Sequence, residues 1–354
     1  MTTPQPDASI PAADISASTP ERTPVPAPPS PHALGAETAE LTGPRTQPSG
    51  RTERLFGLRR HESVRRGPAG DATAGQDAVS WNPARFEVGP WTIGLDGRPT
   101  GAAATIMMDN ATAVAVHHAA AGELEAVVTT ELQVNVLRPL PGFDPSADAD
   151  PADAPQLECW YAPLHGDALG GAARAWLVDE AGVRHVEATG WFQAVPAATP
   201  AALDAFVAHS RLPVDASTRV PMASLLGVDE STVPEADPAA RPQVDPAPRP
   251  GLRFADGSAL ANPQGSMHGG AMTLRAVLAA QAAMPDREKY DVQAIRTIFT
   301  RPGHGEMVAM TRVRHAGRSL RLVDVDLVRL DEAGEPVAEK PMVQVQVTFR
   351  AAQG

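Results

Sequence analysis

An internal duplication constrains the fold of this 354-residue chain more than any other feature of its sequence. Two segments carry the same succession of local patterns. Each begins with a Gly-rich turn that leads into a stretch of small and apolar residues, and each continues into a β-rich stretch that ends in Arg-Pro, at Arg138 and at Arg301. Each then closes with the tetrapeptide Asp-Glu-Ala-Gly, over Asp179–Gly182 and Asp331–Gly334. The shared order predicts two folded copies of one unit.

The periodicity of each copy predicts one helix wrapped by antiparallel strands. Helices are expected over about 101–119 and 269–284, and because the first is apolar nearly all round, it should be enclosed by a sheet. Met342–Phe349 alternates Val and Phe with Gln and Thr, and Arg321–Leu330 does nearly the same, as in strands that bury one face. The fold class is therefore α+β.

Composition divides the chain into four parts. Residues 1–77 are rich in Pro, Ala, Ser and Thr without apolar periodicity, which predicts a disordered arm. The first folded domain is expected at 81–197. A short helix and a Pro-rich, semi-rigid linker are expected at 198–250. The second folded domain follows at 251–350.

Bulk properties exclude several classes of function. The formal net charge of -12 disfavours nucleic acid as a partner, and no apolar stretch is long enough to cross a membrane. Because Met1–Ile10 does not read as a secretory signal, a cytoplasmic location is expected. The single cysteine, Cys159, cannot form an internal disulfide and is expected to be a half-buried strand residue. No cofactor and no metal are expected.

Candidate catalytic residues fall in both segments. The second contains Asn262 and, six positions later, His268-Gly269-Gly270 at the start of its helix. The first contains Asp109 within its helix and Thr129 on the following strand. A lone Asp in an apolar helix is rare, because burying an unpaired carboxylate is costly, so Asp109 is expected to have a functional role.

This pattern resembles the phenylacetate-pathway (PaaI-type) branch of the hot-dog-fold acyl-CoA thioesterases. In that family an Asn precedes His-Gly-Gly, an acid lies nine positions after the His, and a Ser or Thr follows on the next strand. Here the second segment has Val277 at the position of the acid. The first has Thr100 and Gly94 at the positions of the His and the Asn. The two segments are defective in complementary ways.

The resemblance implies a double hot-dog, with two antiparallel sheets joined into one and each wrapping a central helix. In the family the acid of one hot-dog faces the His-Gly-Gly turn of the other, so a tandem chain should have one complete composite site and one empty site. It also implies acyl-CoA as the substrate and association of the double units into homo-oligomers.

The resemblance and thioester chemistry imply a role for each residue. Asp109 would activate a water or attack the carbonyl directly, two routes that the sequence leaves open. The Gly269 N–H, at a helix N-terminus, would stabilise the oxyanion. Asn262 would donate its amide nearby, and His268 would brace the turn or contact the thioester. Thr129 would orient the water, although a Thr is also common in strands.

The residues that bind coenzyme A are less clearly indicated by the sequence than the catalytic residues. Gly270, Arg138 and Arg301 are candidates for binding it, although either Arg could equally be a surface residue at a strand end. Two other functions stay open. A hot-dog enoyl-CoA hydratase would need a His five positions after Asp109, where Val114 stands. A non-catalytic acyl-CoA binding protein would use the same groove without turnover.

Overall fold

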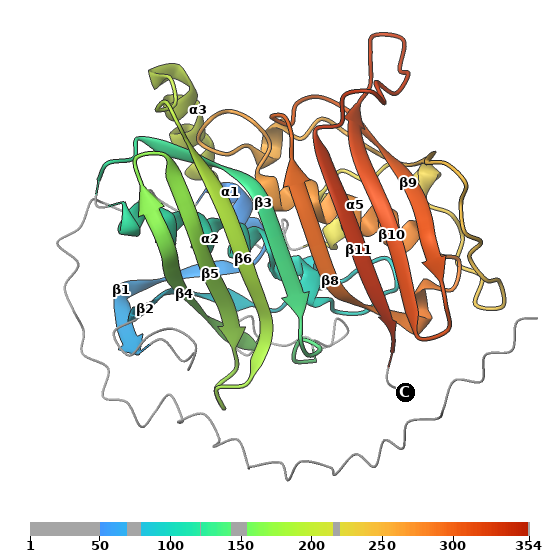
Figure 1. Cartoon of the computed structure of the whole chain (residues 1–354), viewed down its shortest axis with the longest axis horizontal. Helices are drawn as coiled ribbons and strands as arrows, with labels where there is room; N and C mark the ends of the chain where they lie inside the picture. Colours follow the sequence, from blue (N-terminus) through green and yellow to red (C-terminus); the bar gives the residue numbers. More distant parts are fainter. Residues whose placement is uncertain (1–49, 69–78, 121, 143–153, 215–219, 353–354) are drawn as a thin grey trace, which may run out of the picture.

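The computed structural model describes residues 50–68, 79–120, 122–142, 154–214 and 220–352 (Figure 1). Within them one continuous antiparallel sheet of eleven strands runs across the molecule. The strands before residue 200 are β1 (Leu58–Pro68), β2 (Val79–Glu87), β3 (Ala126–Val136), β4 (Gln156–Asp167), β5 (Gly170–Val178) and β6 (Arg184–Val195). The strands after it are β7 (Arg249–Phe254), β8 (Tyr290–Phe299), β9 (Met307–Ala316), β10 (Leu320–Arg329) and β11 (Val343–Ala351).

Five α-helices accompany the sheet in the described residues: α1 (Arg51–Leu55), α2 (Thr105–Ala119), α3 (Pro200–Ser210), α4 (Met222–Leu225) and α5 (Gly269–Ala282). The 3-10 turns η2 (Pro90–Thr92) and η3 (Gly101–Ala104) precede α2, and η7 (Ser258–Leu260) precedes α5. Short turns η6 (Glu230–Thr232) and η8 (Arg287–Lys289) lie in connections. The long helices α2 and α5 lie side by side behind the sheet (Figure 1).

Apart from the edge strand β1, the strand order repeats as a mirror image about the centre of the sheet. From one edge it reads β1-β2-β4-β5-β6-β3, and from the centre onward β8-β11-β10-β9-β7. The halves join where β3 pairs with β8, with Leu132 opposite Thr297 and Val134 opposite Ile295. The α+β class and the joined antiparallel sheet are as expected, and the architecture is that of a double hot-dog.

Burial explains why α2 and α5 occupy the centre. Their sequences are apolar on most faces, so exposing any of them to water would be unfavourable. Side chains from Ala271 to Leu278 on α5 are fully or almost fully buried. On α2, Ile106 and Met108 are also fully buried. Both helices therefore pack against the sheet and against each other.

The two halves repeat small details as well as strand order. The isolated bridge Ile93–Pro99 before α2 corresponds to Ala261–Met267 before α5. The Asp179 carboxylate accepts hydrogen bonds from the N–H groups of Ala181 and Val183 in its hairpin. The Asp331 carboxylate accepts the same pair of bonds in the second half. These matches place Gly94 opposite Asn262 and Thr100 opposite His268.

The expectation of a disordered arm up to residue 77 was wrong for residues 50–68. These residues form α1 and β1, and Leu55, Phe56 and Leu58 are buried in the core. Five helical residues are too few to give a periodic apolar pattern, so composition alone did not distinguish them from the tail. Residues 1–49 and 69–77 of the predicted arm lie outside the described residues.

Two further features of the chain became visible only in the structure. The Pro-rich segment before β7 packs on the second half, because Asp245 is buried and its carboxylate accepts a hydrogen bond from the Val313 N–H at 2.9 Å. Cys159 on β4 is fully buried instead of half-buried.

Candidate functional site

Asp109 lies buried on α2 at the contact between the two central helices. Its exposed fraction is 5%. The Thr129 hydroxyl on β3 donates to Asp109 Oδ1 at 2.7 Å, and the Gly270 backbone N–H on α5 donates to Oδ2 at 2.9 Å. The His268 Nδ1 atom lies 3.3 Å from the same Oδ2. The predicted residues Asp109, Thr129, His268 and Gly270 therefore meet at one place.

His268 closes the N-terminus of α5 with its side chain. The Gly270 N–H donates to His268 Nδ1 at 3.1 Å, as in a helix N-cap. In the neutral ring an accepting Nδ1 places the hydrogen on Nε2. Nε2 faces the carboxylate of Glu53, with 3.8 Å between Nε2 and Oε1. Both ring nitrogens of His268 thus face a carboxylate from the first half.

The two glycines at the start of α5 serve different contacts. A Cβ on Gly269 would lie 2.8 Å from Asp109 Oδ2, so the missing side chain lets the carboxylate approach the helix N-terminus. A Cβ on Gly270 would lie 2.5 Å from the Ile106 Cα atom on α2. Gly270 therefore permits the close packing of α5 on α2 and presents its N–H to Asp109.

Asn262 does not contact Asp109 within the part of the chain that the structure describes. Its side-chain oxygen accepts hydrogen bonds from the N–H groups of Gln264 and Ser266, at 2.9 and 3.2 Å. An Asn that bonds to the backbone two residues on stabilises its own turn. The Asn262 turn leads directly into His268, so the observed contact holds the loop that precedes the N-cap.

Sequence reasoning assigned no role to two polar residues beside this cluster. Glu53 on α1 is 5% exposed, and Asn110 on α2 donates to Glu53 Oε1 from its Nδ2 at 3.1 Å. Asn110 could have been suspected from its place next to Asp109. Glu53 belongs to the segment that composition assigned to the tail, and it lies 57 positions from Asn110.

The equivalent positions of the other half hold no comparable group. Asp109 corresponds to Val277, and Asn110 to Leu278, by the same offset that relates Thr100 to His268. A bulge follows Thr129 in β3, and the matching bulge in β8 follows Val292, so Val292 corresponds to Thr129. The Thr100 side chain still caps its helix by accepting from the Ala102 N–H at 3.3 Å. The pair of half-sites that contains Asp109 is polar, whereas the pair that contains Val277 is mainly apolar.

Arg138 and Arg301 lie at opposite ends of the sheet. Each follows the end of a central strand, and because β3 and β8 are antiparallel these ends point in opposite directions. The register places Arg301 at the end of the sheet that carries Thr129. Arg138 lies at the other end of the sheet, which carries the half-site pair with Val277. The two arginines therefore cannot both line one channel at Asp109.

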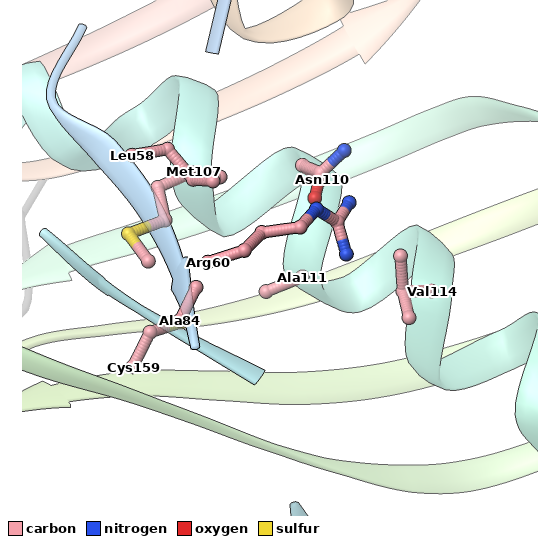
Figure 2. Close-up of a pocket in the computed structure, with 8 residues that line it drawn as sticks. All are labelled: Leu58, Arg60, Ala84, Met107, Asn110, Ala111, Val114 and Cys159. Carbon is pink, nitrogen blue, oxygen red and sulfur yellow. The ribbon is translucent and has the colours of Figure 1, made fainter. Parts of the chain in front are cut away.

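A small pocket adjoins the cluster on the side of β1 (Figure 2). It is lined mainly by apolar side chains, with two polar groups among them: Leu58, Arg60, Ala84, Met107, Asn110, Ala111, Val114 and Cys159. Burial lowers the pKa of Arg60, and the negative charge of Glu53 acts in the opposite direction. The pocket brings Asn110 and Val114 of α2, one and five positions after Asp109, close to Arg60.

A family model describes part of this chain. Residues 259–350 match the acyl-CoA thioesterase N-terminal domain, and this range contains the Asn262 turn, His268 and the two glycines. No curated protein matches the chain. The described residues contain no helix long and apolar enough to cross a membrane. Nor do they contain a group of three His, Cys, Asp or Glu side chains that could hold a metal ion.

Several solved structures are similar to this chain at low sequence identity. The tesB protein of Mycobacterium avium subsp. paratuberculosis is 14% identical over 85% of this chain and 98% of its own, with a TM-score of 0.46. An acyl-ACP thioesterase from Bacteroides thetaiotaomicron is 8% identical over 75% and 96%, with a TM-score of 0.40. The Escherichia coli PaaI protein is 20% identical over 29% and 72%, with a TM-score of 0.25.

The family match over residues 259–350 and the architecture agree with the hot-dog-fold thioesterase class that the sequence pattern indicated. More particularly, residues 259–350 of the second half are similar to an acyl-CoA thioesterase domain. The expected enzyme class, an acyl-CoA thioesterase that hydrolyses thioesters, is thereby confirmed.

Proposed function

We propose that the chain hydrolyses acyl-CoA thioesters at one composite site, with Asp109 from the first half and the N-terminus of α5 from the second. The observation that carries this proposal is the buried Asp109 carboxylate bonded to the Gly270 N–H at 2.9 Å and lying 3.3 Å from His268. The two halves must therefore pack together for the site to exist. The arrangement supports a PaaI-type site in tandem form.

The reaction needs an attacking oxygen and a site for the developing oxyanion. As a general base, Asp109 takes a proton from water while the oxygen attacks the thioester carbonyl carbon. The carbonyl oxygen becomes an oxyanion beside the Gly269 N–H, where the first-turn donor and the helix dipole stabilise it. The C–S bond then breaks, and the CoA thiolate takes the proton that Asp109 holds.

A nucleophilic route uses the same atoms. In that route an Asp109 oxygen attacks the carbonyl carbon, the CoA thiolate leaves, and a mixed anhydride forms that water hydrolyses. Thr129 supports either route, because its hydroxyl donates to Oδ1 and fixes the orientation of the carboxylate. This contact makes Thr129 a positioning residue for Asp109 in addition to its expected role toward water.

The pseudo-equivalent site is proposed to be inactive. Val277 cannot replace the acid, and Thr100 replaces His268 only as a helix cap. One CoA is therefore expected per chain. Arg301, at the Thr129 end of the sheet, is the better candidate for contacting its phosphates, whereas Arg138 lies at the inactive end. Gly270 contributes through the α2–α5 contact.

Turnover of a panel of acyl-CoA substrates, followed by release of the free thiol, tests this function. Asp109→Asn keeps the size of the side chain and removes its charge, so kcat should fall by at least about a hundredfold with the fold intact. The matched variants Thr100→Ala and Val277→Ala should keep normal kcat. Normal turnover by Asp109→Asn would overturn the composite site.

Two further outcomes separate the alternative functions. Tight binding of acyl-CoA without thiol release by the natural chain would identify a binding protein. Hydration of an enoyl-CoA would identify a hydratase, although Val114, five positions after Asp109, lies in the apolar lining of the pocket. Equilibrium titration with a non-hydrolysable acyl-CoA analogue should saturate at one equivalent per chain.

A further inference from the structure

We propose that Glu53 is a positioning residue of this site, which orients the His268 imidazole from the side opposite to Asp109. The inference rests on the proposed function of the Asp109 cluster and adds a third segment of the chain to it. Glu53 lies on α1, far in sequence from both central helices. Its Oε1 atom lies 3.8 Å from His268 Nε2 and accepts a hydrogen bond from Asn110.

The burial of Glu53 argues for a role beyond packing. The side chain is 5% exposed, and within the described residues its Oε2 atom is buried without a hydrogen-bond partner. A buried carboxylate oxygen that lacks a partner destabilises the fold. A group retained at that cost is more readily explained by the site that it faces than by stability.

The second half shows what this corner looks like when no site is present. The turn after α1 and the turn after α4 are equivalent, because Gly57 and Gly227 both have positive φ, at 82° and 65°. The Gly57 carbonyl accepts from the Glu87 N–H, and the Gly227 carbonyl accepts from the Ala255 N–H. Counting back four residues from each Gly places Ala223 opposite Glu53.

The same substitution pattern extends to the neighbours of Glu53. Leu278 stands opposite Asn110, and Thr100 stands opposite His268. The helix and the turn form in both halves, so the fold does not require a carboxylate at this position. The Asp109 site has Glu53, Asn110 and His268 together, whereas the corresponding positions of the other half-site pair have none of these residue types.

The geometry gives Glu53 a defined effect on the His268 ring. The His268 Nδ1 atom lies near the Gly270 N–H and 3.3 Å from Asp109 Oδ2, whereas Nε2 faces Glu53. The Glu53 carboxylate favours the tautomer with the hydrogen on Nε2 and disfavours a flipped ring, as acceptors on the far nitrogen of functional histidines do. The ring then keeps its Nδ1 face toward Asp109 and the N-terminus of α5.

The test compares two buried glutamates of the full-length chain. Glu53→Gln removes the charge and keeps the shape, and should lower kcat about tenfold with little change in KM. The 15N chemical shifts of the His268 ring should move toward a mixture of tautomers. Glu87→Gln removes a comparable charge, 4% exposed and paired with Arg59 at 2.7 Å. It should leave kcat and the His268 shifts unchanged.

Asn110→Leu introduces the residue found at position 278 and provides a second measurement if Glu53→Gln does not fold. It removes the hydrogen bond that holds Oε1, so kcat and the His268 shifts should change in the same direction. Normal kcat and unchanged shifts in the folded variants would overturn the role of Glu53, provided that Asp109→Asn is inactive. Absence of thioester hydrolysis by the natural chain would instead reject the proposed function.

Discussion

The Asp109 carboxylate on α2 accepts a hydrogen bond from the Gly270 backbone N–H on α5, with 2.9 Å between Oδ2 and the nitrogen. This contact links the acid of one half to the helix N-terminus of the other, where the helix dipole favours a negative charge. It depends on the close approach of α5 to Ile106, which the absent side chain of Gly270 permits. The site and the interface between the halves are therefore one structural feature.

Removal of the His268 side chain should impair turnover more than stability. His268→Ala loses the cap at the α5 N-terminus, which lowers the free energy of unfolding by about 1 kcal/mol, and it should lower kcat because the imidazole beside Asp109 is gone. The loss should be smaller than for Asp109→Asn, since the Gly269 N–H remains. Urea unfolding and kcat measure the two effects. Thr100→Ala removes the equivalent cap, and an equal loss of kcat in that variant would contradict the prediction.

The two adjacent glycines should respond differently to a methyl group. Gly270→Ala places a Cβ 2.5 Å from the Ile106 backbone, so the free energy of unfolding should fall by about 1–3 kcal/mol through overpacking. Gly269→Ala places it 2.8 Å from Asp109 Oδ2, so the carboxylate must move and kcat should fall with a smaller loss of stability. Thermal unfolding and steady-state kinetics of both variants check this. Identical behaviour of the two variants would refute the separate roles.

Truncation should distinguish residues 1–49 from residues 50–68. A chain that begins at Gly50 keeps α1, β1 and Glu53, and should retain its solubility and kcat. A chain that begins after Asp77 loses the buried side chains of Leu55, Phe56 and Leu58. Burial of each large apolar side chain stabilises the fold by roughly 1.5–3 kcal/mol. That shorter chain should be insoluble or inactive. Normal activity of the shorter chain would show that α1 and β1 are dispensable.

Cys159 should be unreactive in the native protein. It is fully buried on β4, and burial raises the pKa of its thiol, so the reactive thiolate is scarce at neutral pH. A thiol reagent such as an aromatic disulfide should label no cysteine in native buffer and one per chain in urea. Released CoA can then be followed without background from the enzyme. Rapid labelling of the native chain would show that β4 opens.

The sequence by itself determined the repeated order of elements and the residue types of each half-site. Apolar periodicity was enough to predict the helices at about 101–119 and 269–284, and the structure has helical residues over 101–119 and 269–282. Asp109 was conspicuous because a carboxylate in an apolar helix is costly unless it has partners. The complementary substitutions at Thr100 and Val277 indicated that the halves share one site.

Only the tertiary structure decided which distant groups meet. Glu53 lies on a helix of five residues, too short for a periodic pattern, and reaches His268 through the packing of α1 on the opposite half. The side-chain oxygen of Asn262 accepts hydrogen bonds from N–H groups of its own turn, a contact that the sequence pattern did not predict. The antiparallel pairing of β3 and β8 sent Arg138 and Arg301 to opposite ends. Local patterns specify elements, whereas contacts across 57 or 161 positions depend on how those elements pack.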